Sequence, residues 1–65
     1  MDTNALRLLR RPEVEARTGL RRSTIYELMA AGSFPKPVPI TGRSVAWSSA
    51  EVDAWISSRI AARAA

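Results

Sequence analysis

The sequence contains no cysteine and no histidine. Without a thiol or an imidazole it lacks disulfides, the common zinc ligands and the usual general base near neutral pH. The longest uninterrupted apolar run is Leu28 to Ala31, whereas a membrane-spanning helix needs about 20 such residues. These absences exclude a disulfide-stapled or zinc-stapled mini-domain and a membrane span, and we expect no metal, no cofactor and no catalytic residue.

The chain has 65 residues, which allows a single domain over residues 1–65, with residues 1–5 expected to be disordered. A domain of this size buries only about 60% of its unfolded surface, so its core is too small to enclose a deep catalytic pocket as well. We therefore expect a protein that is not an enzyme. The first four residues, Met1 to Asn4, do not resemble a signal peptide, which predicts a soluble, cytoplasmic protein.

Positive charge exceeds negative charge, with ten Lys and Arg against six Asp and Glu and a net charge of +4. Apolar residues make up 46% of the chain, which is typical of a folded globule rather than a basic disordered tail. All but one of the basic residues are Arg, whose planar fork matches phosphate and guanine edges. The charge favours a nucleic-acid partner, although Arg-rich usage also follows from the base composition of a coding gene.

The first predicted helix follows a short apolar segment, Leu6 to Leu9, which is either a short strand or an extended lead-in. Arg11-Pro12-Glu13-Val14 is typical of a helix start, because Pro loses nothing at the first helical position and Glu favours the positive end of the helix dipole. Gly19 suits a left-handed cap, so this helix is short.

A second helix is predicted from about Arg22 to Ala31, opened by Ser23 or Arg22 and closed by Gly32. Its apolar residues recur at i, i+3 and i+4, which indicates one buried stripe: Ile25, Leu28 and Met29. Two short helices joined by a tight turn that contains Gly are typical of a helix-turn-helix.

A small hairpin is predicted next, because apolar residues alternate on both sides of a turn at Thr41-Gly42-Arg43: Val38, Ile40, Val45 and Trp47. Pro39 lacks a backbone donor, so its strand is expected at the edge of the sheet. An isolated hairpin is unstable, so the apolar face of this one needs helices packed against it.

The last predicted helix begins at about residue 49. Ser48-Ser49-Ala50-Glu51 matches a capping box, and Trp47 and Val52 stand where a hydrophobic staple would. Glu51 and Asp53 point in different directions, so they are cap and dipole residues rather than a catalytic pair. The buried stripe of this helix is predicted to be Val52, Trp55, Ile56 and Ile60.

A buried stripe on the second helix leaves polar residues on its opposite side, with Arg21 just before it: Arg22, Ser23, Tyr26 and Glu27. A helix fits the major groove of DNA, so this surface is a candidate DNA-binding site. Arg22 can fork onto a guanine, and Ser23 or Thr24 can bond a phosphate. Helix capping is the open alternative for both hydroxyls.

The remaining candidates have open alternatives too. Tyr26 either contacts sugar and phosphate or covers the edge of the core, and Glu27 either accepts from a cytosine or orients Arg21 or Arg22. Arg43, at the hairpin tip, can reach a minor groove or a phosphate, or it is an ordinary turn residue. Candidates by charge alone, each more often a solvated surface residue, are Lys36, Arg7, Arg10 and Arg11. Trp47 and Trp55 are expected in the core rather than stacked on bases.

Several motifs together resemble the AlpA-like family of prophage regulators: Leu8-Leu9-Arg10-Arg11-Pro12-Glu13-Val14, Thr18-Gly19-Leu20, Arg22-Ser23-Thr24-Ile25-Tyr26, Ala31-Gly32-Ser33-Phe34-Pro35-Lys36-Pro37, Trp47, and Glu51-Val52-Asp53-Ala54-Trp55. The resemblance covers about residues 6 to 60. It implies a mainly α domain with a small β-hairpin, a winged helix-turn-helix related to MerR-type domains and phage excisionases. It also implies regulation of integrase or other mobile-element genes, and some relatives bend DNA as recombination directionality factors.

The resemblance places the DNA-binding residues on the second helix and the hairpin turn: Arg22, Ser23, Thr24, Tyr26 and Arg43. Two positions depart from the family pattern. Arg21 stands where a Ser often opens the recognition helix, so capping is expected to shift to Ser23. Glu15 stands where a small residue is usual, which predicts either looser packing of the two helices or an outward tilt of this side chain.

The leading hypothesis is a sequence-specific regulator that binds double-stranded DNA, and the alternative within the same mode is an excisionase that bends attachment sites. From a different class, the fold could serve as a protein-interaction module that uses Trp47, Trp55 and Ile60. One such domain contacts only a few base pairs, so a homodimer, a cooperative array or an integrase is an expected partner. The C-terminal helix or the edge strand at Pro37 to Ile40 would supply the contact.

Overall fold

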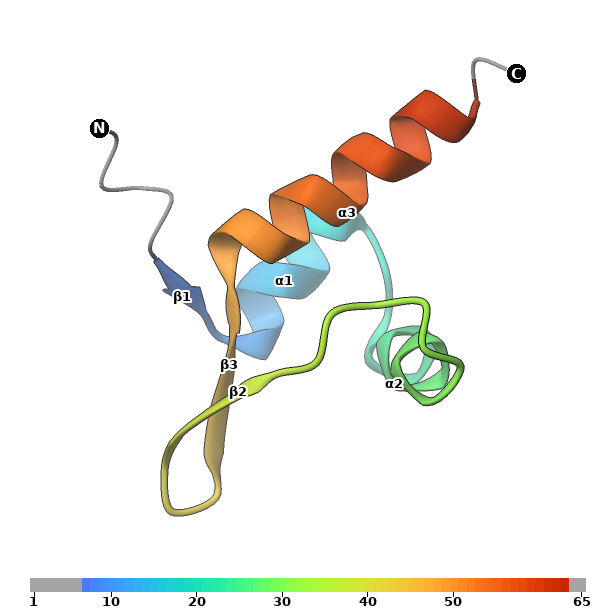
Figure 1. Cartoon of the computed structure of the whole chain (residues 1–65). Helices are drawn as coiled ribbons and strands as arrows, with labels where there is room; N and C mark the ends of the chain where they lie inside the picture. Colours follow the sequence, from blue (N-terminus) through green and yellow to red (C-terminus); the bar gives the residue numbers. More distant parts are fainter. Residues whose placement is uncertain (1–6, 64–65) are drawn as a thin grey trace.

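The computed structural model describes residues 7–63, so the expected disorder of residues 1–5 lies outside the described part. Three helices and a small antiparallel sheet form the chain, in agreement with the mainly α prediction (Figure 1). The elements in chain order are β1 (Leu8–Leu9), α1 (Arg11–Thr18), α2 (Arg22–Ala30), β2 (Val38–Thr41), β3 (Ser44–Ser48) and α3 (Ser49–Ala62).

Helix α1 begins and ends where the sequence predicts. Its first residue is Arg11 with Pro12 behind it, and Gly19 follows the helix with a φ of 73°. That left-handed conformation lets the Gly19 N–H donate to the Glu15 carbonyl at 2.8 Å, which satisfies a free carbonyl at the helix end. The Glu15 side chain tilts to the surface, where its carboxylate accepts from Arg11 Nε at 3.0 Å.

Helix α2 begins at Arg22, so the prediction that Ser23 caps it is wrong. The N-cap is Arg21, whose extended backbone accepts from the Ile25 N–H at 3.0 Å and whose side chain makes no cap bond. Ser23 already lies within the helix, where its hydroxyl cannot take the N-cap position. Gly32 ends the turn at a φ of 76° and donates to the Met29 carbonyl at 3.0 Å, as predicted for a helix terminus.

The sheet has the order β1-β3-β2, so β2 lies at an edge, as the donor-free Pro39 predicts. Thr41 pairs with Ser44, which shortens the turn to two residues, Gly42 and Arg43. The register shifts by one residue between Pro39 and Thr41. Helices α1 and α3 both contact β3, the central strand of this small sheet.

The expected apolar face of the hairpin is wrong for β2. Val38 and Ile40 are 37% and 42% exposed. Val38 pairs with Ala46, so it lies on the opposite side of the sheet from Val45 and Trp47. Ile40 falls at the register shift, which breaks the alternation.

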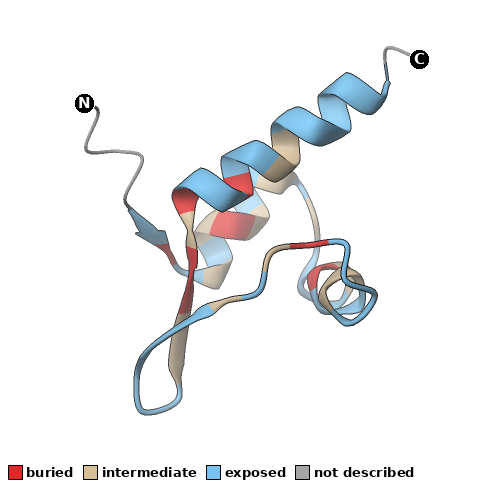
Figure 2. Cartoon of the chain, viewed as in Figure 1, coloured by how far each residue is buried: buried red, intermediate tan, exposed pale blue. Residues whose placement is uncertain are grey.

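Helix α3 starts at Ser49, as predicted, with Ser48 as its N-cap. The Ser48 hydroxyl accepts from the Glu51 N–H at 3.3 Å. The predicted burial of Ile60 is wrong, because its side chain is 52% exposed. Figure 2 shows why: the C-terminal half of α3 extends past the body of the domain, and residues 57–63 are exposed.

The core draws one or two residues from almost every element: Leu9, Val14, Ile25, Phe34, Trp47 and Val52. Leu28 and Met29 pack against it, so the predicted stripe of α2 is confirmed. Over residues 7–63, no helix has the length and apolar character that crossing a membrane requires.

Candidate nucleic-acid interface

Burial of Ile25 turns the opposite side of α2 to the surface. The exposed residues there are those that the sequence nominates: Arg21, Arg22, Ser23, Tyr26 and Glu27. Thr24 is half-buried beside Ile25 and is the least accessible of the nominated residues. The start of α2 is thus a polar, basic surface with one aromatic ring.

Tyr26 and Arg22 contact each other on this surface. The Arg22 guanidinium carbon lies 5.7 Å from the centre of the Tyr26 ring, a cation–π contact. The ring remains 39% exposed, so it covers the core edge only in part. No ion pair within residues 7–63 joins Glu27 to Arg21 or Arg22.

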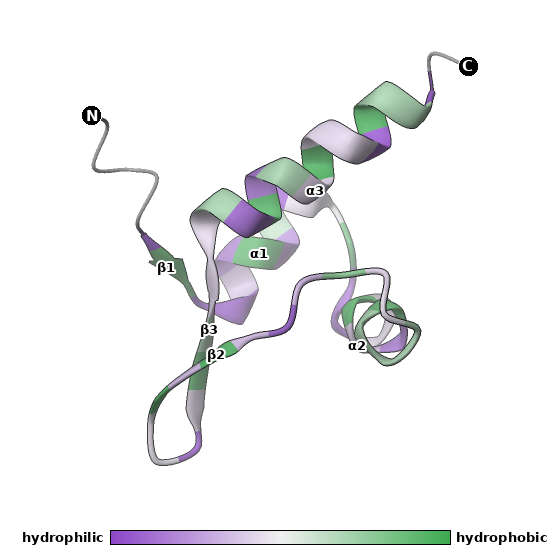
Figure 3. Cartoon of the chain, viewed as in Figure 1, coloured by the Kyte–Doolittle hydropathy of each residue, from purple (hydrophilic) through white to green (hydrophobic). Residues whose placement is uncertain are grey.

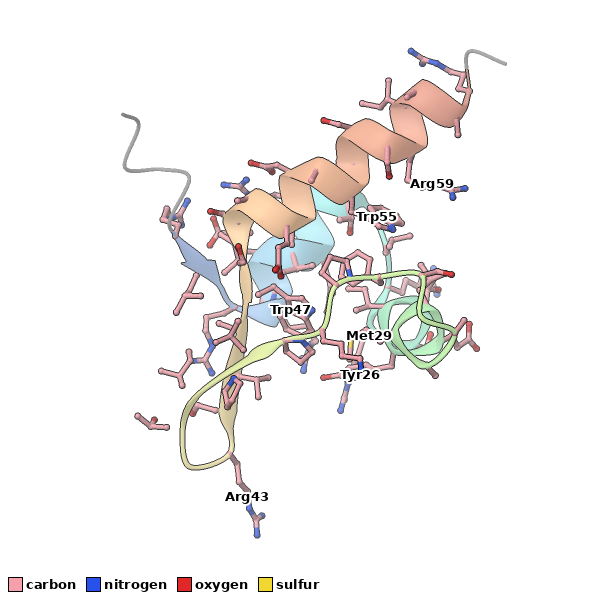
Figure 4. The ribbon with its side chains drawn as sticks, viewed as in Figure 1. Tyr26, Met29, Arg43, Trp47, Trp55 and Arg59 are labelled. Atoms are coloured by element: carbon pink, nitrogen blue, oxygen red, sulfur yellow. The ribbon has the colours of Figure 1, made fainter. Side chains whose placement is uncertain are left out.

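A groove of about 440 Å³ lies between the start of α1 and the hairpin, and α2 contributes Tyr26 to its lining. It brings together Tyr26 and Arg43, two of the nominated residues, from elements distant in the sequence. In Figure 4 the Arg43 side chain extends away from the tip of the hairpin, and Tyr26 projects from α2. The full lining is Arg10, Arg11, Pro12, Tyr26, Arg43, Ser44, Val45 and Trp47.

The groove also contains residues that the sequence could not single out. The sequence identifies Arg10 and Arg11 by charge alone, and no motif in the sequence identifies Ser44. Figure 3 shows hydrophilic residues at the start of α1 and on the β3 side of the hairpin turn. The available signal is that Arg10 and Arg11 open a helix whose start the sequence does predict.

Four ion-pair contacts neutralise one group of arginines. Arg7 bonds Glu13 at 2.8 Å, Arg11 bonds Glu15 at 3.0 Å, and Arg17 bonds Asp53 at 2.9 Å and approaches Glu13 at 3.9 Å. Within residues 7–63 the cations outside any ion pair are Arg10, Arg21, Arg22, Lys36, Arg43, Arg59 and Arg63. Four of these seven belong to α2, the hairpin and the segments that adjoin them, and a fifth, Arg10, precedes α1 and lines the groove.

Lys36 is exposed in the segment between α2 and β2 and does not line the groove. Two indoles hold this segment: Trp47 Nε1 donates to the Pro35 carbonyl at 3.1 Å and Trp55 Nε1 donates to the Ser33 carbonyl at 2.7 Å. Phe34 meets Trp55 edge to face at 4.9 Å between ring centres. Trp47 is fully buried, so it cannot serve as the contact of an interaction module.

This arrangement can bind a polyanion. Guanidinium groups and hydroxyls are hydrogen-bond donors for phosphate oxygens, and the groove lining contains no acidic residue. Residues 7–63 contain no cluster of three acidic side chains that could hold a metal ion.

Comparison with known proteins identifies the family of this chain. The chain is 52% identical over 62 residues to the uncharacterized protein ORF88 of Enterobacteria phage P4, covering 95% of this chain and 70% of that protein. It is 40% identical over 62 residues to the DNA-binding transcriptional activator AlpA of Escherichia coli K12, covering 86% of this chain and 89% of AlpA. The family model of the prophage CP4-57 regulatory protein AlpA matches residues 7–60. The chain belongs to the AlpA family of prophage regulatory proteins.

Proposed function

We propose that this chain binds duplex DNA in a sequence-specific manner and regulates transcription of genes of a prophage or a related mobile element. The observation that carries the proposal is a set of cations outside any ion pair, of which two line the groove and one lies over the Tyr26 ring of its lining: Arg10, Arg43 and Arg22. A relative that is 40% identical bears the name of a DNA-binding transcriptional activator, which supports it.

In the proposed binding mode the domain is a winged helix-turn-helix. Helices α1 and α2 are joined by residues 19–21 and form the helix-turn-helix, and the β2–β3 hairpin is the wing. Helix α2 enters the major groove, whose width of about 12 Å admits a helix. Arg22 contacts base edges there, and the Gly42-Arg43 turn contacts the adjacent backbone or minor groove.

A single domain of this kind buries roughly 600–1,000 Å² against DNA, which rarely gives high specificity. We therefore expect a second copy, a cooperative array or an integrase on the same DNA. An excision factor would use the same surface, and DNA bending separates the two roles. A bend at attachment-site DNA, measured by the change in electrophoretic mobility as the site is moved along the fragment, would favour the excision factor.

Equilibrium binding of the full chain tests the proposal. The probes are duplex DNA from upstream of its own gene and of the neighbouring integrase gene, with random duplex as reference, across a salt series. We expect a preference of roughly 10³ or more for an upstream duplex, and loss of that preference in Arg22→Glu and Arg43→Glu.

Arg63→Glu is the matched control, since Arg63 is exposed at the far end of α3 and makes the same change in net charge. It should keep the preference. A wild-type chain with equal affinity for every duplex would overturn the proposal, and so would equal losses in all three variants. In those cases the exposed end of α3 becomes the surface to test for a protein partner.

A further inference from the structure

Three arginines lie near the start of α1, and they differ in whether they form an ion pair. Arg7 donates to both carboxylate oxygens of Glu13 at 2.8 and 3.1 Å. Arg11 donates to Glu15 at 3.0 Å. Arg10 is exposed, makes no ion pair within residues 7–63 and lines the groove. Of the three guanidinium groups, that of Arg10 is the one left to meet an anion.

The groove holds a second such cation on its opposite side. Arg43 lies at the hairpin turn and also makes no ion pair among the described residues. Tyr26 adds a hydroxyl from α2, and buried Trp47 gives the lining an apolar element. Its volume of about 440 Å³ falls within the range of small-molecule sites, roughly 300–1,000 Å³. It is therefore an electropositive recess rather than a flat basic surface.

This inference rests on the proposed function, because the proposed binding mode determines which part of the DNA meets the recess. With α2 in the major groove and the hairpin turn at the minor groove, the sugar–phosphate strand between the two grooves has to cross the surface between α2 and the hairpin. The recess lies on this path, because its lining joins Tyr26 of α2 to Arg43 of the hairpin and to Arg10 at the start of α1. Phosphate contacts set the register of a protein on a duplex, while base contacts give the sequence preference.

We propose that the recess binds one phosphodiester of this strand, and that Arg10, with Arg43, supplies the charge. Tyr26 connects this phosphate site to Arg22, because its side chain lines the recess while Arg22 lies over its ring at 5.7 Å. A phosphate held in the recess fixes the position of Tyr26 and, through the ring, the direction in which Arg22 approaches the bases.

Neutralising the charge of Arg10 tests the site directly. Arg10→Gln should lower affinity for specific and random duplex alike, by about tenfold near 0.1 M salt, and should reduce the slope of log affinity against log salt by about one. Arg10→Lys should recover most of the affinity. Arg63→Gln is the matched control and should leave slope and affinity unchanged, because Arg63 lies outside the recess at the end of α3. Circular dichroism confirms that each variant is folded.

A scan with neutral methylphosphonate linkages identifies the phosphate. In the wild-type chain, neutralising one linkage between the two grooves should weaken binding, and in Arg10→Gln that same linkage should have a smaller effect, because only the Arg43 contribution remains. A wild-type salt slope in Arg10→Gln, or a loss that is independent of every single linkage, would overturn the phosphate site while leaving the proposed function intact. A wild-type chain without sequence preference would instead overturn the proposed function.

Discussion

The three helices of this domain begin in two different ways. Helix α3 starts behind Ser48, whose hydroxyl accepts from the Glu51 N–H, and Glu51 places negative charge in the first turn. Trp47 and Val52 are both fully buried on either side of this cap. Each feature satisfies a free N–H group or favours the positive end of the helix dipole. The start of α3 is thus built for stability.

Helices α1 and α2 each start with two consecutive arginines instead. Arg10 and Arg21 are the N-caps, neither makes a side-chain cap bond, and Arg11 and Arg22 follow them. Helix α1 still has Glu13 in its first turn, whereas α2 has no acidic residue there. A cation at this end of a helix opposes the dipole, by typically 0.3–1 kcal/mol. Both starts become favourable when an anion arrives, which is what DNA backbone supplies. The comparison teaches that a helix start can carry residues that favour folding, as at α3, or cations that oppose the dipole, as at α2, where we propose that they serve DNA binding.

The largest expected loss of stability comes from replacing Trp47, the residue that precedes the N-cap of α3. Trp47→Ala should destabilise the domain by about 3–5 kcal/mol, against a total stability of roughly 3–10 kcal/mol for a chain of this length. We expect a largely unfolded protein by far-ultraviolet circular dichroism. Trp47→Phe keeps an aromatic ring but loses the bond to the Pro35 carbonyl, so it should fold with a lower urea midpoint. A native midpoint in Trp47→Ala would contradict the assignment of this residue to the core.

Removing the cap itself should have a smaller effect. Ser48→Ala leaves the Glu51 N–H without its acceptor and should cost about 1 kcal/mol in urea unfolding. DNA affinity of the folded fraction should not change, because Ser48 does not line the recess. The matched control is Ser57→Ala on the exposed part of the same helix, where alanine should be neutral or slightly stabilising. Equal losses in the two variants would mean that the cap contributes nothing specific.

Introducing a serine at the N-cap of α2 should raise the stability of the protein, whereas removing the serine at the N-cap of α3 should lower it. Arg21→Ser introduces a good N-cap and removes an opposed charge, so it should stabilise the free protein by about 0.5–1 kcal/mol while lowering its affinity for DNA. Arg21→Ala removes the charge without adding a cap. It should lose the same affinity with a smaller gain in the urea midpoint. A gain in both stability and affinity for Arg21→Ser would break the distinction between the two kinds of helix start.

The sequence predicts features that depend on neighbours in the chain and misses those that depend on distant ones. The cap of α3, the helix end at Gly19 and the stripe at Ile25 are local patterns, and all three are confirmed. Ile60 continues the helical spacing, but whether a helix turn meets a core depends on how far the rest of the domain extends.

The same reasoning applies to the candidate site. The exposed side of α2 follows from helical periodicity alone, since burying Ile25 fixes which residues point outward. The absence of an ion pair at Arg10 does not follow from periodicity, because it depends on which arginines form ion pairs with acidic residues. The Arg11–Glu15 pair has the i, i+4 spacing of a helix and was accessible to sequence reasoning. The Arg7–Glu13 pair required the placement of β1 beside α1.

The smallest expected effect concerns the negative charge of Asp53, about one turn beyond the N-cap of α3. The sequence predicts Asp53 as a dipole residue, but its carboxylate accepts from Arg17 of α1 at 2.9 Å. Both side chains are well exposed, at 32% and 59%, so Asp53→Asn should cost only about 0.2–1 kcal/mol at low salt. The difference should vanish near 1 M salt, where the screening length falls to about 3 Å. The urea midpoint of each protein at low and high salt measures this. A loss that persists in high salt would mean that Asp53 supports the start of α3 through hydrogen bonding, and the helix would then owe its stability to more than the cap at Ser48.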